Sequence, residues 1–242
     1  MLCVAVACAL ASRAHAFSDP LSYEIEPEFG GGGGRWFSGS SADGFGCEVC
    51  HEGGPTADLA ISGLPLDGFV PGAAYEIAIG WPATAPHVAL IAELADEQRH
   101  GVGTIMLPRP EATPETERCS GELLGAPSSN VQVTADGRQL ISVVDCGAQQ
   151  VRFQWSVPID APEAVWLNVG FITSDEDTTP RGDGVTMAKR LLVRNGSTRA
   201  AQVVAQGCNA IGTPSEHGSL VTSLCLLVAV LWRRCHSKLE AP

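Results

Sequence analysis

Apolar and polar side chains alternate without a break along Gln150-Val151-Arg152-Phe153-Gln154-Trp155-Ser156-Val157. Because successive side chains of a β-strand point to opposite faces, this period of two predicts a strand whose Val, Phe and Trp side chains face a core. Pro158 follows directly and should end the strand, since proline has no N–H to donate to a neighbouring strand. The segment therefore predicts a half-buried strand of an all-β domain.

Further apolar or alternating runs, separated by turn residues, flank this strand on both sides. Their number and spacing are typical of a β-sandwich. One of them, 87–94, is apolar throughout and fits a strand or a short helix equally well. The runs are 59–61, 75–79, 87–94, 131–133, 139–144, 165–173 and 187–193.

Charge and motif content limit the classes of function. The chain of 242 residues carries 27 acidic and 15 basic side chains, for a formal net charge of −12. Binding to a phosphate backbone needs a basic stripe, so this balance argues against nucleic acid as a partner. The sequence has no G-x-S-x-G, H-E-x-x-H or phosphate-loop motif, and we expect a binding or structural protein rather than an enzyme.

The N-terminus indicates export. Residues 2–10 are apolar, and a small-x-small triplet follows that ends at Ala16. This order is typical of a secretory signal peptide over 1–16, with cleavage after Ala16. The next range, 17–46, is rich in glycine and poor in periodic apolar residues, which predicts a flexible lead-in.

The C-terminus indicates anchoring. Cys208 lies in a processing and linker region, 196–219, which precedes an apolar run of 13 residues over 220–232 and then two arginines. Such a run makes a helix about 20 Å long, shorter than the roughly 30 Å hydrocarbon core of a bilayer. The arrangement resembles the myxobacterial C-terminal sorting tail known as MYXO-CTERM. The resemblance implies a hydrophobic helix and basic sorting tail over 220–242, cleavage near Cys208, and attachment to the outer membrane, cell surface or envelope; a simple membrane anchor is the alternative.

Cys47-Glu48-Val49-Cys50-His51 is a C-x-x-C-H motif. In an exported protein this motif predicts one covalent c-type haem, because two thiols can bond the porphyrin vinyl groups while the adjacent imidazole reaches the iron. Cys47, Cys50 and His51 are thus the predicted cofactor-binding residues. The module would then transfer electrons to a redox partner or sense a small ligand.

The second axial position on the iron has several candidates. His87 and His100 are the histidines of the domain that could join His51 as metal ligands. Met106 lies in an apolar run that is more typical of a core, and an open position is also compatible with the motif.

Three other interpretations of the motif stay open. The two thiols could form a redox-active dithiol, share a zinc site with histidines, or be bonded in disulfides. In the last two cases the chain would be a structural or adhesive surface module that presents its loops to a partner. If haem does occupy Cys47 and Cys50, the cysteines left for a structural disulfide in an oxidising compartment are Cys119 and Cys146.

Several motifs follow one another in a fixed order along the chain. They are Pro71-Gly72-Ala73-Ala74-Tyr75, the Cys119 and Cys146 pair, Val151-x-Phe153-x-Trp155-x-x-Pro158, Val165 to Phe171, and Gly182-Asp183-x-Val185. This order resembles that of reelin-type (Reeler) domains and of the choice-of-anchor surface domains that open with C-x-x-C-H. The resemblance implies an immunoglobulin-like sandwich over 47–195.

The acidic loop with Asp175, Asp177 and Asp183 indicates turn chemistry rather than a ligand site.

Overall fold

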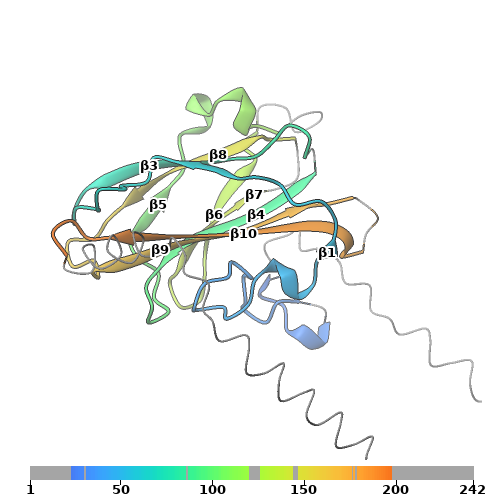
Figure 1. Cartoon of the computed structure of the whole chain (residues 1–242), viewed down its shortest axis with the longest axis horizontal. Helices are drawn as coiled ribbons and strands as arrows, with labels where there is room; N and C mark the ends of the chain where they lie inside the picture. The colour runs from blue at the N-terminus through green and yellow to red at the C-terminus, as the bar shows by residue number, and fades with distance from the viewer. Residues whose placement is uncertain are drawn as a thin grey trace, which may run out of the picture. The chain divides into compact units, whose positions relative to one another are not determined.

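The computed structural model describes residues 23–29, 31–85, 87–119, 126–143, 147–175, 177 and 179–197. Its strands form two sheets packed face to face (Figure 1), a six-stranded sheet in the order β1-β10-β9-β4-β7-β6 and a four-stranded sheet in the order β2-β3-β8-β5. The predicted signal peptide with Ala16, positions 198–219 of the predicted linker, which include Cys208, and the predicted sorting tail lie outside the described residues. Within the described part, no helix is long and apolar enough to cross a membrane.

The predicted all-β sandwich is confirmed. Each predicted run overlaps a strand, and 87–94 belongs to a strand rather than a helix. The short strands β1 and β5 are additions that no alternation indicated. The strands are β1 (Glu52–Gly53), β2 (Ala60–Ser62), β3 (Ala74–Gly80), β4 (Val88–Ala95), β5 (Thr104–Met106), β6 (Ser129–Val133), β7 (Gln139–Val143), β8 (Gln150–Ser156), β9 (Ala164–Thr173) and β10 (Arg181–Val193), and short 3-10 helices occur at Pro27–Phe29, Cys47–Val49, Pro110–Ala112 and Glu115–Glu117.

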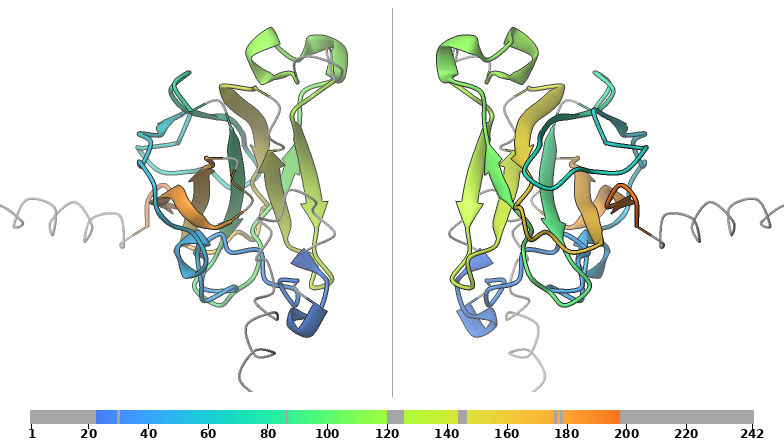
Figure 2. Two further views of the ribbon diagram at one scale, coloured as in Figure 1. Left: turned by 90° about the vertical axis from the view of Figure 1, so that its right-hand side faces the viewer. Right: turned by 90° about the vertical axis from the view of Figure 1, so that its left-hand side faces the viewer.

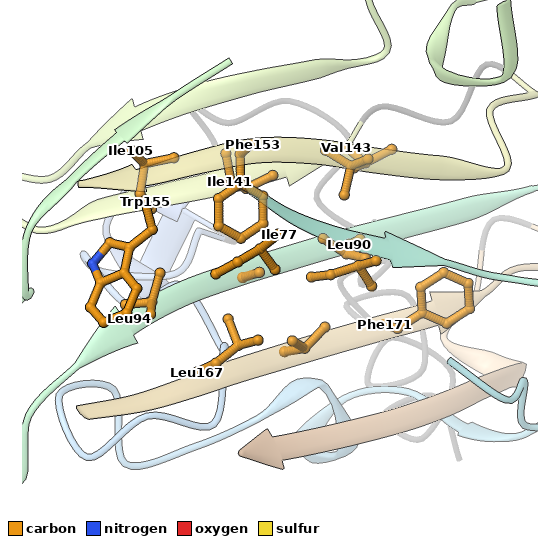
Figure 3. Packing of buried hydrophobic residues seen from close by; sticks show 14 of the residues in the cluster. Ile77, Leu90, Leu94, Ile105, Ile141, Val143, Phe153, Trp155, Leu167 and Phe171 are labelled. Atoms are coloured by element: carbon orange, nitrogen blue, oxygen red, sulfur yellow. The ribbon is translucent and has the colours of Figure 1, made fainter. Parts of the chain in front are cut away.

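The core lies between the two sheets, and Phe153 and Trp155 of β8 are part of it (Figure 3). Val151, Phe153 and Trp155 are at most 1% exposed, as the alternation predicts. The indole N–H of Trp155 donates a hydrogen bond to the carbonyl of Val102 at 2.8 Å, so the one polar atom of this side chain is satisfied inside the core. Truncating a buried Phe or Trp to Ala costs about 3–5 kcal/mol, so Phe153 and Trp155 each contribute substantially to the stability of the domain.

The outer face of the six-stranded sheet is covered by the N-terminal layer, defined as described residues 23–29 and 31–51 (Figure 2, blue). Tyr23 stacks on Trp36 with ring centroids 4.7 Å apart, and the pair packs on Ile91 of β4 and Leu140 of β7. Trp36 is only 2% exposed. Over 23–29 and 31–46 the structure thus differs from the flexible lead-in expected for 17–46, because the large apolar side chains Tyr23 and Trp36 are buried against the sheet.

Candidate functional site

The C-x-x-C-H segment folds into a single tight turn. A 3-10 helix begins at Cys47, and the backbone N–H groups of Cys50 and His51 both donate to the carbonyl of Cys47, at 3.2 and 3.1 Å. Strand β1 follows at once and pairs in parallel with β10, opposite Arg181 and Asp183. This pairing holds the turn against the outer face of the six-stranded sheet.

The two thiols have different surroundings. Cys47 is 8% exposed, and its thiol donates to the carbonyl of Phe37 at 3.5 Å. Burial, assisted by the charge of Glu48, raises the pKa of Cys47 to about 12, so its sulfur stays protonated and unreactive in the folded chain. Cys50 is exposed, and both cysteines are free thiols, so no disulfide joins them.

Gly170 on β9 makes room for the Cys47 sulfur. A Cβ at this position would lie 2.7 Å from Sγ of Cys47 and 3.0 Å from the carbonyl oxygen of Phe37. Both distances are shorter than side chains tolerate, so the turn can approach the sheet this closely only above a residue without a side chain.

His51 and Asp183 form a buried hydrogen bond. Its Nδ1 lies 2.6 Å from Oδ2 of Asp183, and the two side chains are 8% and 1% exposed. The other carboxylate oxygen, Oδ1, accepts the backbone N–H of Asp175 at 3.2 Å. Within the described residues no hydrogen bond involves Nε2 of His51, which leaves that nitrogen for a ligand.

The predicted second ligands lie at different places. His87 precedes β4, and its carbonyl accepts the N–H of Ser174 at 2.9 Å, so it lies at the end of the sheet where β10 presents Asp183. His100 follows the opposite end of β4, has a side chain 76% exposed and contacts Asp96 through Nδ1 at 3.2 Å. Met106 is 47% exposed on β5 of the other sheet. Among the described residues no group of three or more His, Cys, Asp and Glu is arranged to hold a metal ion, so the second ligand stays a prediction.

The structure adds residues near the turn that sequence reasoning did not select. Asp183 was assigned to turn chemistry, and its contact with His51 depends on strand pairing that no local pattern reveals. Met187 pairs with Gly170 across β10 and β9, and a Cβ added at Gly46 would lie 2.6 Å from its terminal methyl carbon. The thioether side chain of Met187 therefore packs beside the start of the C-x-x-C-H turn.

A buried ionic cluster joins the N-terminal layer to the sheet. Arg138 donates to both oxygens of Glu93 at 3.2 and 3.1 Å and to Asp43 at 3.1 Å. Ser38 donates from its backbone and its hydroxyl to Asp43, at 3.0 and 2.9 Å, and its hydroxyl also contacts Glu93. Asp43 and Ser38 come from the layer, whereas Glu93 is on β4 and Arg138 precedes β7. The cluster therefore fixes the layer that carries the turn.

Cys119 is disulfide-bonded, and Cys146, its predicted partner, lies outside the described residues.

An open cavity of about 400 Å³ is lined by Asp58, Trp81, Thr116 and Gln149 among others. None of its lining residues belongs to the C-x-x-C-H turn, so the cavity is separate from the candidate site.

The strand order and the docked turn define an all-β sandwich with a C-x-x-C-H segment on its outer face. No family model and no curated protein matches the chain. Among solved structures it is similar to a reeler domain of human F-spondin, with TM-score 0.36 and 15% identity over 60% of this chain and 91% of that one. It is also similar to the Reelin-N domain of F-spondin, with TM-score 0.39 and 14% identity over 61% and 94% of the two chains. A third similar structure is AggA, the major subunit of aggregative adherence fimbriae type I from Escherichia coli, with TM-score 0.34 and 6% identity over 59% and 96%.

Proposed function

We propose that this chain is an exported, envelope-anchored β-sandwich module that carries one covalent c-type haem at Cys47, Cys50 and His51. Its task would be electron transfer or ligand sensing at the cell surface with a redox partner, rather than enzymatic turnover. The observation that carries the proposal is the C-x-x-C-H turn, in which Nδ1 of His51 is bound by a buried carboxylate and Nε2 has no hydrogen-bond partner among the described residues.

The donor set fits the chemistry of haem attachment. The exposed Cys50 thiol is available to form one thioether bond. Cys47 would form the other, and because its sulfur packs against Gly170 and the carbonyl of Phe37, this bond would have to form before the N-terminal layer closes on the sheet. His51 would bind the iron through Nε2. When bound, the haem supplies one-electron exchange or an iron position for a small ligand.

Expression with the c-type maturation machinery tests the proposal. A denaturing gel stained for haem peroxidase activity and a pyridine haemochrome spectrum should show haem that stays with the wild-type polypeptide. Cys50→Ser should lose the two-bond attachment, whereas Arg190→Ala, a change at an exposed side chain, should keep it. A folded wild-type protein without haem would contradict the proposal.

A structural or adhesive module is the second candidate, and the burial of Cys47 favours it. In that function the C-x-x-C-H turn only pins the N-terminal layer to β9 and β10, and the loops bind a partner. Haem would then be absent after maturation, and Cys50→Ser would leave the stability of the domain within about 0.5 kcal/mol of wild type, as for other exposed positions.

The anchoring part of the proposal rests on the C-terminal sequence. Deleting 220–242 should release the domain into the medium, because the hydrophobic helix and the arginines would be gone. Retention on the cell envelope after this deletion would contradict anchoring by the tail.

A further inference from the structure

The backbone seats Asp183 beside His51 with little freedom. Gly53 of β1 pairs with Asp183, and the N–H of Gly54 donates to the carbonyl of Asp183 at 3.0 Å. A Cβ at Gly184 would lie 1.8 Å from the carbonyl oxygen of Pro55, and one at Gly54 would lie 2.0 Å from that of Gly182. The segment 53–55 and the start of β10 therefore approach each other at a distance that only glycine permits. This close approach places His51 in contact with the carboxylate of Asp183.

Both oxygens of the Asp183 carboxylate have a hydrogen-bond partner. Oδ2 contacts Nδ1 of His51 at 2.6 Å, Oδ1 accepts the N–H of Asp175 at 3.2 Å, and the side chain is 1% exposed. Among the ion pairs between described residues, none joins Asp183 to a Lys or Arg, and the side chain that contacts its carboxylate there is His51. A buried carboxylate is unfavourable unless it is hydrogen-bonded, so the contact with Nδ1 of His51 compensates part of the cost of burying Asp183.

We propose that Asp183 is the positioning residue of the haem site. Its carboxylate accepts the Nδ1 proton of His51, which fixes the ring orientation and the tautomer and keeps Nε2 unprotonated for the iron. In the haem-loaded protein the same negative charge would increase electron donation from the imidazole and so favour the oxidised iron. This inference rests on the proposed haem function and adds a residue that the C-x-x-C-H motif does not contain.

Two measurements test the inference. In wild-type protein produced without the maturation machinery, ¹⁵N NMR of the imidazole should show His51 with its proton on Nδ1. In haem-loaded protein, Asp183→Asn should keep the thioether-bound haem but shift its midpoint potential to more positive values. Asp177→Asn is the matched control, because it removes the same charge from an exposed side chain in the loop that precedes β10, and its potential should equal that of wild type.

The outcomes separate the inference from the proposed function. A wild-type protein that never retains haem overturns both. Covalent haem in wild type, together with an unchanged potential in Asp183→Asn, overturns the role of Asp183 alone. If Asp183→Asn does not fold, the NMR measurement on wild type decides, and a proton on Nε2 of His51 overturns the inference.

Discussion

Replacing Arg138 by Ala should strongly destabilise the domain. The side chains of Arg138, Glu93 and Asp43 are 5%, 0% and 1% exposed, so removal of the guanidinium leaves two carboxylates buried without their cation. Breaking a buried ion pair from one side costs roughly 3–5 kcal/mol. In a domain of this size each kcal/mol lowers Tm by about 2–4 °C, so we expect Tm to fall by roughly 6–20 °C.

Urea denaturation followed by tryptophan fluorescence measures this loss, because Trp36 lies in the N-terminal layer and Trp155 in the core. Arg190→Ala removes an exposed guanidinium and should stay within about 0.5 kcal/mol of wild type. The double variant Arg138→Met with Glu93→Gln should regain part of the loss, because one of the stranded charges is gone. A free energy of unfolding for Arg138→Ala within about 1 kcal/mol of wild type would refute the reasoning.

Three further outcomes follow from the same contacts. Burial raises the pKa of the Glu93 carboxyl above its ordinary value of 4.5, so the folded state binds the proton of Glu93 more tightly than the unfolded state. The free energy of unfolding of wild type, relative to that of Glu93→Gln, should therefore fall as pH rises from 4.5 through the raised pKa. Denaturation curves whose difference does not depend on pH would contradict this expectation. In haem-free wild-type protein a maleimide should label the exposed Cys50 and not the buried Cys47. Gly170→Ala should make Cys47 reactive, because the added Cβ would lie 2.7 Å from its sulfur and displace it. Equal labelling of both cysteines in wild type would contradict the burial of Cys47. Non-reducing peptide mapping of protein from the envelope should link Cys119 to Cys146, and a free Cys146 thiol would reject the pairing.

The parts of the fold that sequence predicts well are those with one buried face. Strand β8 alternates because its inner side chains meet the core and its outer ones are accessible, so its burial follows directly from its sequence. Strand β4 is ambiguous for the opposite reason. The N-terminal layer covers its outer face, so both faces are buried and the alternation disappears.

The layer and Asp183 were harder to predict for a different reason. A glycine-rich segment with one Trp and one Tyr has no periodicity, and its order comes from distant contacts with Ile91 and Leu140. The contact between His51 and Asp183 likewise spans 132 positions and depends on a parallel pair of only two residues. The motif identified the chemistry of the site, whereas the tertiary structure supplied its orientation.

The long sequence separation between the C-x-x-C-H turn and Asp183 determines which of them is synthesised first. His51 leaves the ribosome well before Asp183, which lies 132 residues later. Closure of so long a loop is slow compared with local folding, so the two thiols stay accessible during an interval before β9 and β10 are made and paired. Once β9 and β10 have joined the sheet and the N-terminal layer has packed on it, the side chain of Cys47 is buried between the layer and β9. Any enzyme that modifies both cysteines must therefore act on the nascent or unfolded chain.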